Sequence, residues 1–387
     1  MAFRPMTTLR HAATASVLLV AALTVVEIWL WSQAVTAAQT VTDRCAVEDQ
    51  SLLVASAVSH HELRRLLKTT HQANEHSPSH LFRVNSVGCR GDEPDMPAAD
   101  GTYRILMLGD DTICGTAVGE DETVAARLQQ FLSQETTAGI EVINGGIPGY
   151  CPLLSWLKFE HDLAKLKPQL VILHVDMTDV ADDASCRSLL MIDEDHAVCT
   201  HPTLRLLPRP ESALMRFVKQ SAIASWLFAK ARRHGPALLS VSGTSTSGEC
   251  ALAWIADPSP DLRLHVRHAL SPIEMLKAAV ENSGGHLLVT TSPVLWQVLP
   301  AKVAPQLSEQ CGISGVTPYE SRFPFEVLGH FCEQSQIHFC DASSAFRSGD
   351  EGAKLFSTDA PVLSRVGMAL YAREIARYLM TNPPVKW

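Results

Sequence analysis

Four short segments carry most of the side chains that could do chemistry, and carboxylates dominate them. They are GDDT (109–112), NGGIPGY (144–150), HVDMTDVADD (174–183) and FSTDAPVLSRVG (356–367). Carboxylates can act as general acids or bases, or as ligands for hard cations. Glycine-rich turns can point backbone N–H groups at a bound oxygen. The segments predict a polar site, provided that the fold brings them together.

Alternating strand and helix patterns place these segments at the ends of strands. We expect strands at 103–108, 140–144, 170–175, 286–291 and 337–340. We expect helices at 122–134, 153–166, 272–282, 325–335 and 364–380. This order predicts an α/β fold, a three-layer sandwich with a mostly parallel, doubly wound sheet. In such a sheet the ligand crevice lies beyond the carboxyl ends of the strands.

An apolar segment near the N-terminus predicts membrane targeting. The length of the apolar segment at 12–34 and its tryptophans, Trp29 and Trp31, favour an uncleaved transmembrane signal anchor. Arg4 and Arg10, which precede it, predict that residues 1–11 lie in the cytoplasm. A cleaved signal peptide stays open as the alternative, because small residues follow the apolar segment. Either interpretation places the rest of the chain outside the cytoplasm.

The chain after this segment divides into a connecting part and a domain. Residues 35–100 are expected to form a stalk and linker, with a helix over 51–72 because its apolar positions have helical spacing. The globular domain is expected at 101–382, with an insertion at about 186–270 where the alternation weakens.

Charge and cysteine content narrow the class of protein. The net charge is −9, which repels phosphate backbones and argues against binding to nucleic acid. Ten cysteines are many for a reducing compartment, and the pairs Cys186/Cys199 and Cys332/Cys340 could each close a short loop. No spacing matches a zinc motif, so structural thiols or disulfides are expected.

The order and spacing of the four segments resemble those of the SGNH (GDSL-type) hydrolase superfamily. The stretch RVNSVGCRGDE (83–93) is also similar to the segment that precedes the domain in membrane-anchored bacterial members. The resemblance covers residues 83–183 and about 285–380. It implies a three-layer α/β/α esterase-type domain, often acting on carbohydrate esters, without a cofactor.

The resemblance also implies a set of catalytic positions, most of which are altered here. Asp111 stands where the family has its nucleophilic serine, and Thr178 where it has an oxyanion-binding asparagine. Gly149 matches the glycine that supplies an oxyanion N–H. Asp359 is retained, but Val362 replaces the histidine base.

These replacements oppose ester hydrolysis on physical grounds. An attacking hydroxyl needs a base, and Val362 can accept no proton. The Asp111 charge would repel the developing oxyanion by roughly 4 kcal/mol at about 4 Å and an effective dielectric near 20, which corresponds to about a thousandfold in rate. The sequence therefore predicts a catalytically degenerate domain, with an active esterase or acyltransferase using a rearranged site as the alternative.

Other candidate nucleophiles and bases near these segments are expected to be packed or surface residues. They are Thr112, Cys114, Ser357, His174 and His338, and no two of them stand at a motif spacing. His174, within an apolar strand, is expected to be a satisfied core histidine.

The crevice carboxylates raise the separate question of a metal ion. Asp110, Asp111, Asp176, Asp179 and Asp359 would approach the same crevice, and clustered oxygens suit calcium or magnesium. Asp110 and Asp179 are instead expected to cap loops and helix N-termini. No metal is predicted, and the metal site stays open as the alternative.

Together these observations predict a single-pass membrane protein with an extracytoplasmic SGNH-like domain that binds or scaffolds at the cell envelope. The expected partner is an acylated cell-envelope glycan or an envelope protein.

Overall fold

The computed structural model describes residues 52–72, 78–193, 196–206, 260–299, 322–346, 352–357 and 362–382. The predicted anchor at 12–34 and the predicted site residue Asp359 lie outside the described residues. None of the helices in these ranges is long and apolar enough to cross a bilayer. The described residues up to Arg205 and those from 260 onward belong to one compact unit.

A five-stranded parallel sheet lies at the centre of this unit. Its strands are β5 (Thr102–Leu108), β6 (Gly139–Asn144), β7 (Leu170–His174), β10 (His286–Thr291) and β11 (His338–Asp341). Their order across the sheet is β11-β10-β7-β5-β6. Counted along the chain this is the doubly wound order 2-1-3-4-5, whose topological switch point lies between β5 and β7.

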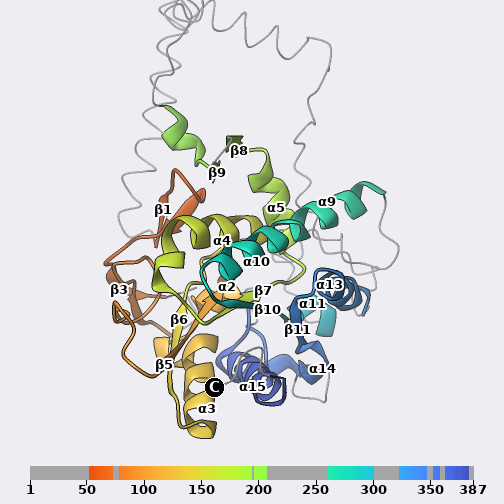
Figure 1. The fold of residues 1–387 in the computed structure, drawn as a ribbon. Helices are drawn as coiled ribbons and strands as arrows, with labels where there is room; N and C mark the ends of the chain where they lie inside the picture. The colour runs from red at the N-terminus through yellow and green to blue at the C-terminus, as the bar shows by residue number, and fades with distance from the viewer. Residues whose placement is uncertain are drawn as a thin grey trace, which may run out of the picture. The chain divides into compact units, whose positions relative to one another are not determined.

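Helices cover both faces of the sheet because its strands are apolar on both sides. In β5, Ile105 and Met107 belong to one core cluster, and Leu106 and Leu108 to the other. Figure 1 shows the helices of the two faces on opposite sides of the sheet. The first cluster contains residues of α3 (Val124–Glu135) and α15 (Arg365–Thr381), the second residues of α4 (Pro152–Lys158) and α10 (Pro272–Asn282). The predicted three-layer α/β/α class is confirmed.

Shorter elements complete the described chain and include the segments around the site. Helix α2 (Asp111–Cys114) follows β5, and α5 (Asp179–Arg187) follows β7. The hairpin of β8 (Leu190–Asp193) and β9 (His196–Cys199) comes directly after α5. The remaining helical elements are η1 (Glu120–Glu122), η2 (Phe159–Leu163), η3 (Ala164–Leu166), η4 (Pro202–Leu206), α9 (Pro260–Leu270), α11 (Leu295–Val298), α13 (Phe323–Gln334), α14 (Ser343–Phe346) and η6 (Gly352–Lys354).

The predicted stalk helix at 51–72 is wrong. Strands β1 (Leu53–Ala55) and β2 (His61–Leu63) form one hairpin there, and β3 (Lys68–His71) pairs with β4 (His80–Arg83) in a second. Positive φ angles of 62° at His60 and 59° at Leu66 interrupt any helix. Contacts distant in sequence override the helical spacing, since the His60 N–H donates to the carbonyl of Cys199.

The predicted linker before residue 101 is likewise part of the globular unit. Phe82, Val84 and Cys89 are buried in the same core cluster as α4 and α10. The boundary predicted at 101 is therefore wrong for the described residues, because the compact unit already includes Leu52. The two hairpins add apolar surface that covers one side of the α/β core.

Arg90 fixes this N-terminal part to the turn that follows α2. Its guanidinium is buried, with the carbon 4.4 Å from the centroid of the Phe82 ring. Its Nη1 donates to the carbonyls of Cys114 and Gly115, and its Nη2 donates to that of Val118. These carbonyls follow the helix that begins at Asp111, so Arg90 helps to position the family's nucleophile site.

Within the part of the chain that the structure describes, no disulfide joins the cysteines, and all of them are buried: Cys89, Cys114, Cys151, Cys186, Cys199, Cys332 and Cys340. This is the thiol alternative of the sequence prediction. Cys186 and Cys199 nevertheless lie close together, because the Cys199 thiol is 3.4 Å from the carbonyl oxygen of Cys186.

We predict that Arg90→Ala lowers the free energy of unfolding by roughly 3 kcal/mol, because the substitution leaves buried carbonyls without donors. Urea denaturation of the full chain measures the change. Lys68→Ala, an exposed change in β3, is the control and should shift stability by less than about 0.5 kcal/mol. Equal effects of the two substitutions would contradict the role of Arg90.

Candidate functional site

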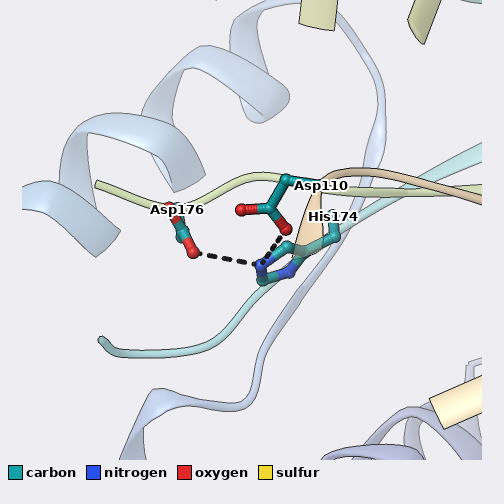
Figure 2. A group of neighbouring side chains, drawn as sticks. All are labelled: Asp110, His174 and Asp176. Atoms are coloured by element: carbon teal, nitrogen blue, oxygen red, sulfur yellow. Dashed lines mark hydrogen bonds and ion pairs between the residues drawn. The ribbon is translucent and has the colours of Figure 1, made fainter. Parts of the chain in front are cut away.

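The predicted crevice residues meet at the switch point of the sheet. Asp110 follows β5, and Asp176 follows β7, whose last residue is His174. Gly109 permits this close approach: its φ is 148°, and a Cβ there would lie 2.9 Å from the His174 Cβ. The side chains of Asp110, His174 and Asp176 point toward one another in Figure 2. The order of the strands therefore brings together side chains that lie up to 66 residues apart in sequence.

Asp110 has the capping role expected from the sequence. Its Oδ1 accepts a hydrogen bond of 2.9 Å from the Thr112 N–H, at the start of α2. Asp179 binds a loop N–H, since its Oδ2 accepts from the Asp176 N–H at 2.6 Å. Both capping expectations are confirmed, and both carboxylates are buried.

His174 is buried, as predicted for a core histidine, yet one of its ring nitrogens faces the crevice. Its Nδ1 lies 2.8 Å from the Tyr371 hydroxyl, which donates to Thr290 Oγ1 at 2.6 Å. A hydroxyl has one proton, so Nδ1–H must be the donor to Tyr371. The other nitrogen, Nε2, lies 3.4 Å from Asp176 Oδ2 and 4.0 Å from Asp110 Oδ1.

Thr178, at the family's asparagine position, does not extend into the crevice as an oxyanion donor. Its hydroxyl donates to Asp176 Oδ1 at 2.8 Å, and its N–H donates to the same oxygen at 2.7 Å. These two bonds hold the Asp176 carboxylate in place before α5. The hydroxyl proton of Thr178 is therefore already used within the loop.

Asp111, at the family's serine position, is held by the loop that should bind an oxyanion. The Gly149 N–H and the Thr116 hydroxyl both donate to its carboxylate. Gly149 has a φ of 69°, which favours glycine at this turn. The donor that the resemblance assigns to an oxyanion thus binds a carboxylate of the chain itself.

Negative charges accumulate in this crevice and raise the pKa values of several carboxyls. Burial and the charge of Asp176 raise the pKa of Asp110 to about 7. Burial and the charges of Asp110 and Asp176 raise the pKa of Asp182 to about 8. Burial also raises the pKa of Asp111, although the Gly149 hydrogen bond opposes this shift.

His174 is the group that offsets part of this charge. Burial alone would lower its pKa, but the hydrogen bond that the imidazole donates to Asp176 and the charges of Asp110 and Asp176 raise it overall. Burial alone would raise the pKa of Asp176, but His174 and the hydrogen bonds from Thr178 lower it. The imidazole and Asp176 therefore stabilise each other's charged forms.

The remaining predicted residues do not add a nucleophile. Thr112 and Cys114 are buried, and burial raises the pKa of the Cys114 thiol to about 12. His338 is exposed at the amino end of β11, opposite the crevice edge of the sheet. Val362 is buried, and its carbonyl accepts from the Ser357 N–H.

Sequence reasoning missed Asp182, Tyr371 and Thr116. Asp182 could have been found, because it lies three residues after Asp179 on α5 and so faces the same side. Tyr371 could not, because α15 reaches His174 only through tertiary packing. Thr116 could not have been found either. It lies after the end of α2 and contacts Asp111 only because the chain turns back on itself there.

Comparisons with known proteins concern the fold. No protein-family model matches the sequence, and no curated protein matches it. The structure is similar to that of an acetylxylan esterase from Geobacillus stearothermophilus, with 15% identity, a TM-score of 0.38, and coverage of 74% of this chain and 95% of that one.

Two further similar structures are described as lipolytic proteins. A protein of the G-D-S-L family from Desulfitobacterium hafniense has 14% identity and a TM-score of 0.36, with coverage of 71% of this chain and 98% of that one. A lipase/acylhydrolase from Enterococcus faecalis has 11% identity and a TM-score of 0.39, with coverage of 74% and 100%. These similarities concern the fold alone. The order of the loops and the sheet topology are those expected from the resemblance to SGNH hydrolases.

We predict that Asp110→Asn stabilises the protein at high pH. The folded-state pKa of Asp110 lies above its unfolded value of about 4, so the carboxyl costs no stability below pH 4 and progressively more as pH rises through 7. The variant should gain on the order of 2 kcal/mol at pH 8 and little at pH 4. Urea denaturation with a chelator present measures both values.

Asp183→Asn is the matched control for this prediction. Asp183 is a buried carboxylate of α5 whose oxygens accept two 2.7 Å bonds from Arg187. Its substitution should destabilise the protein at pH 8, because it leaves a half-buried guanidinium without its counterion. Destabilisation by Asp110→Asn at pH 8 would show that the crevice charges do not repel as inferred.

Proposed function

We propose that this SGNH hydrolase-like domain no longer cleaves esters and instead binds or scaffolds a ligand at the cell envelope. The observation that carries the proposal is the hydrogen bond from the Gly149 N–H to the Asp111 carboxylate. The position of the family's nucleophile holds an acceptor, and the donor expected to stabilise an oxyanion is already bound to it.

The arrangement opposes the tetrahedral intermediate in two ways. A substrate carbonyl would have to displace Asp111 from Gly149 to reach that donor, and the displaced carboxylate would then lose a bond that stabilises its charge. The developing oxyanion would also face the other crevice carboxylates. No residue described at the site supplies an exposed hydroxyl together with a base.

A rearranged active site is the second candidate, because a threonine hydroxyl lies beside carboxylates and an imidazole. Thr178 Oγ1 is 2.8 Å from Asp176, which lies 3.4 Å from His174 Nε2. The imidazole does not reach the hydroxyl directly, and the histidine is 1% exposed. A hydroxyl activated only by a carboxylate with a lowered pKa is a weak nucleophile.

The proposed ligand is an acylated cell-envelope glycan, with an envelope protein as the other partner considered. Acylated glycans are the substrate class of the acetylxylan esterase to which the structure is similar. A binding domain for such a ligand could retain the crevice while losing the reaction. The sequence of residues 12–34 supports attachment to the membrane, with the domain outside the cytoplasm.

We predict that the purified full chain does not hydrolyse p-nitrophenyl acetate or acetylated xylan above the buffer rate. Asp111→Ala should leave this absence of turnover unchanged, because removing the carboxylate supplies no nucleophile. Released nitrophenol and acetate are the measured products. Turnover that Thr178→Val abolishes would overturn the proposal and support the rearranged enzyme.

We predict that the combined variant Asp111→Ser, Thr178→Asn and Val362→His gains measurable esterase activity. The first change frees the Gly149 N–H and supplies a hydroxyl, and the others restore the amide and the imidazole that the resemblance implies. A rate at least about tenfold above the wild-type chain is expected. The variant lacking only Val362→His is the control and should stay inactive, since it has no base.

A further inference from the structure

We propose that Asp110, His174 and Asp176 bind a divalent first-row transition-metal ion, with Zn²⁺ as the best fit, at the switch point between β5 and β7. Each residue offers one donor atom, and the three atoms lie within 4.8 Å of one another. The three side chains point toward one another in Figure 2. The proposal goes beyond the proposed function, since an ion site and the absence of ester cleavage are separate properties.

The distances between the donor atoms suit an ion better than a proton. His174 Nε2 lies 3.4 Å from Asp176 Oδ2 and 4.0 Å from Asp110 Oδ1. A charge-assisted N–H···O bond is about 2.7–2.9 Å long, so neither contact is a strong hydrogen bond. Tetrahedral zinc ligands about 2.0–2.2 Å from the ion are roughly 3.3–3.6 Å apart. The 3.4 Å spacing matches that of atoms sharing one ion, and the 4.0 Å spacing is somewhat longer.

The histidine is also held in the orientation and tautomer that a ligand needs. Because Nδ1–H donates to the Tyr371 hydroxyl, a neutral His174 presents the lone pair of Nε2 to the crevice. Metal-binding histidines usually donate their second ring N–H to a fixed acceptor in this way. Tyr371 is fully buried and is itself fixed by Thr290, so the ring has little freedom to turn.

A weakly hydrogen-bonded oxygen of Asp110 is a further indication of a cation. The Asp110 side chain is 9% exposed, and only the Thr178 hydroxyl approaches its Oδ2, at 3.5 Å. That hydroxyl has one proton, which it donates to Asp176 Oδ1 at 2.8 Å. Among the described residues, this long contact is therefore the weak one of the two that the Thr178 hydroxyl makes, and Oδ2 keeps acceptor capacity for a cation. Figure 2 shows this second oxygen on the side of Asp176, directed into the cluster.

The negative charge of the two carboxylate ligands also favours a bound cation. Asp111, Asp179 and Asp182 surround the two proposed carboxylate ligands, and burial together with the charge of Asp176 raises the pKa of each, so further negative charge is unfavourable there. Within the described part of the chain, no lysine or arginine is among the groups that act most strongly on these carboxyls. Two carboxylates, a neutral imidazole and a dication sum to zero, which is the favourable state for a buried site.

The donor set selects the class of ion. One imidazole nitrogen with two carboxylate oxygens suits borderline ions such as Zn²⁺, whereas Mg²⁺ and Ca²⁺ prefer oxygen ligands alone. Thr178 and Asp182 are partly exposed beside the buried ligands and provide a polar route to them. A coordination position of the ion that no protein atom fills would then face the crevice.

The test uses the full chain, freed of metal with a chelator and dialysed, and then titrated with ZnCl₂ by calorimetry and in thermal melts. We expect one equivalent of Zn²⁺ to bind and to raise the melting temperature by several degrees. Asp110→Asn and Asp176→Asn should each weaken Zn²⁺ binding by at least about tenfold. Asp341→Asn, a change at the same edge of the sheet where the carboxylate pairs with Arg322, should bind as the wild type does.

The two asparagine variants keep the shape of the side chain, and circular dichroism and the melt without metal establish that they are folded. Loss of binding in a variant that these two measurements show to be folded cannot reflect unfolding. Zn²⁺ binding absent up to millimolar concentration would overturn the proposal, as would equal binding in all variants. Equal affinity for Mg²⁺ or Ca²⁺ would overturn the assigned class of ion, and none of these results would bear on ester cleavage.

Discussion

The constraint on which the candidate site depends is the concentration of carboxylates around a single buried imidazole. Asp110 and Asp176 follow adjacent parallel strands, so the sheet forces them together at the switch point. They cannot move apart without disturbing Gly109, where a Cβ would already collide with His174. Their repulsion is therefore built into the backbone, and His174 or a bound cation must offset it.

The same crevice keeps the capacity to bind an anion but satisfies it from within the chain. In an ester-cleaving site of this family type, the N–H at Gly149 would stabilise charge that appears only during the reaction. Here it stabilises the Asp111 carboxylate, a permanent feature of the folded protein. An interaction that is as strong before a reaction as during it lowers no barrier. Under the proposed loss of ester cleavage, the geometry of the loop can thus persist.

Local patterns predicted the α/β core well, and failed where distant segments decide the structure. Helix Pro272–Asn282 and strand His286–Thr291 have the predicted bounds, because apolar periodicity and flanking glycines define them locally. The stretch 51–72 has helical spacing too, but pairing with the segment around Cys199 makes it extended. In the site, the position of Asp182 follows from helical spacing, whereas the contact of Tyr371 with His174 joins residues 197 apart in sequence.

The N-terminal part of the described chain also helps to hold the loops of the candidate site in position. The His61 Nε2 lies 2.7 Å from the carbonyl of Pro148, next to the glycine that binds Asp111. Because a carbonyl only accepts, this ring nitrogen carries the proton and donates it. The Tyr150 hydroxyl, at the end of the same loop, donates to the carbonyl of His61 at 2.7 Å.

These bonds run in both directions between the first hairpin and the loop 144–150, so neither can shift without the other. Arg90 holds the opposite side of Asp111 by binding the carbonyls after α2. The segment that the sequence suggests as a mere connection is therefore what keeps the Gly149 N–H aimed at Asp111. Any ligand that enters the crevice meets a loop whose conformation is fixed from outside the α/β core, which lowers the entropic cost of binding there.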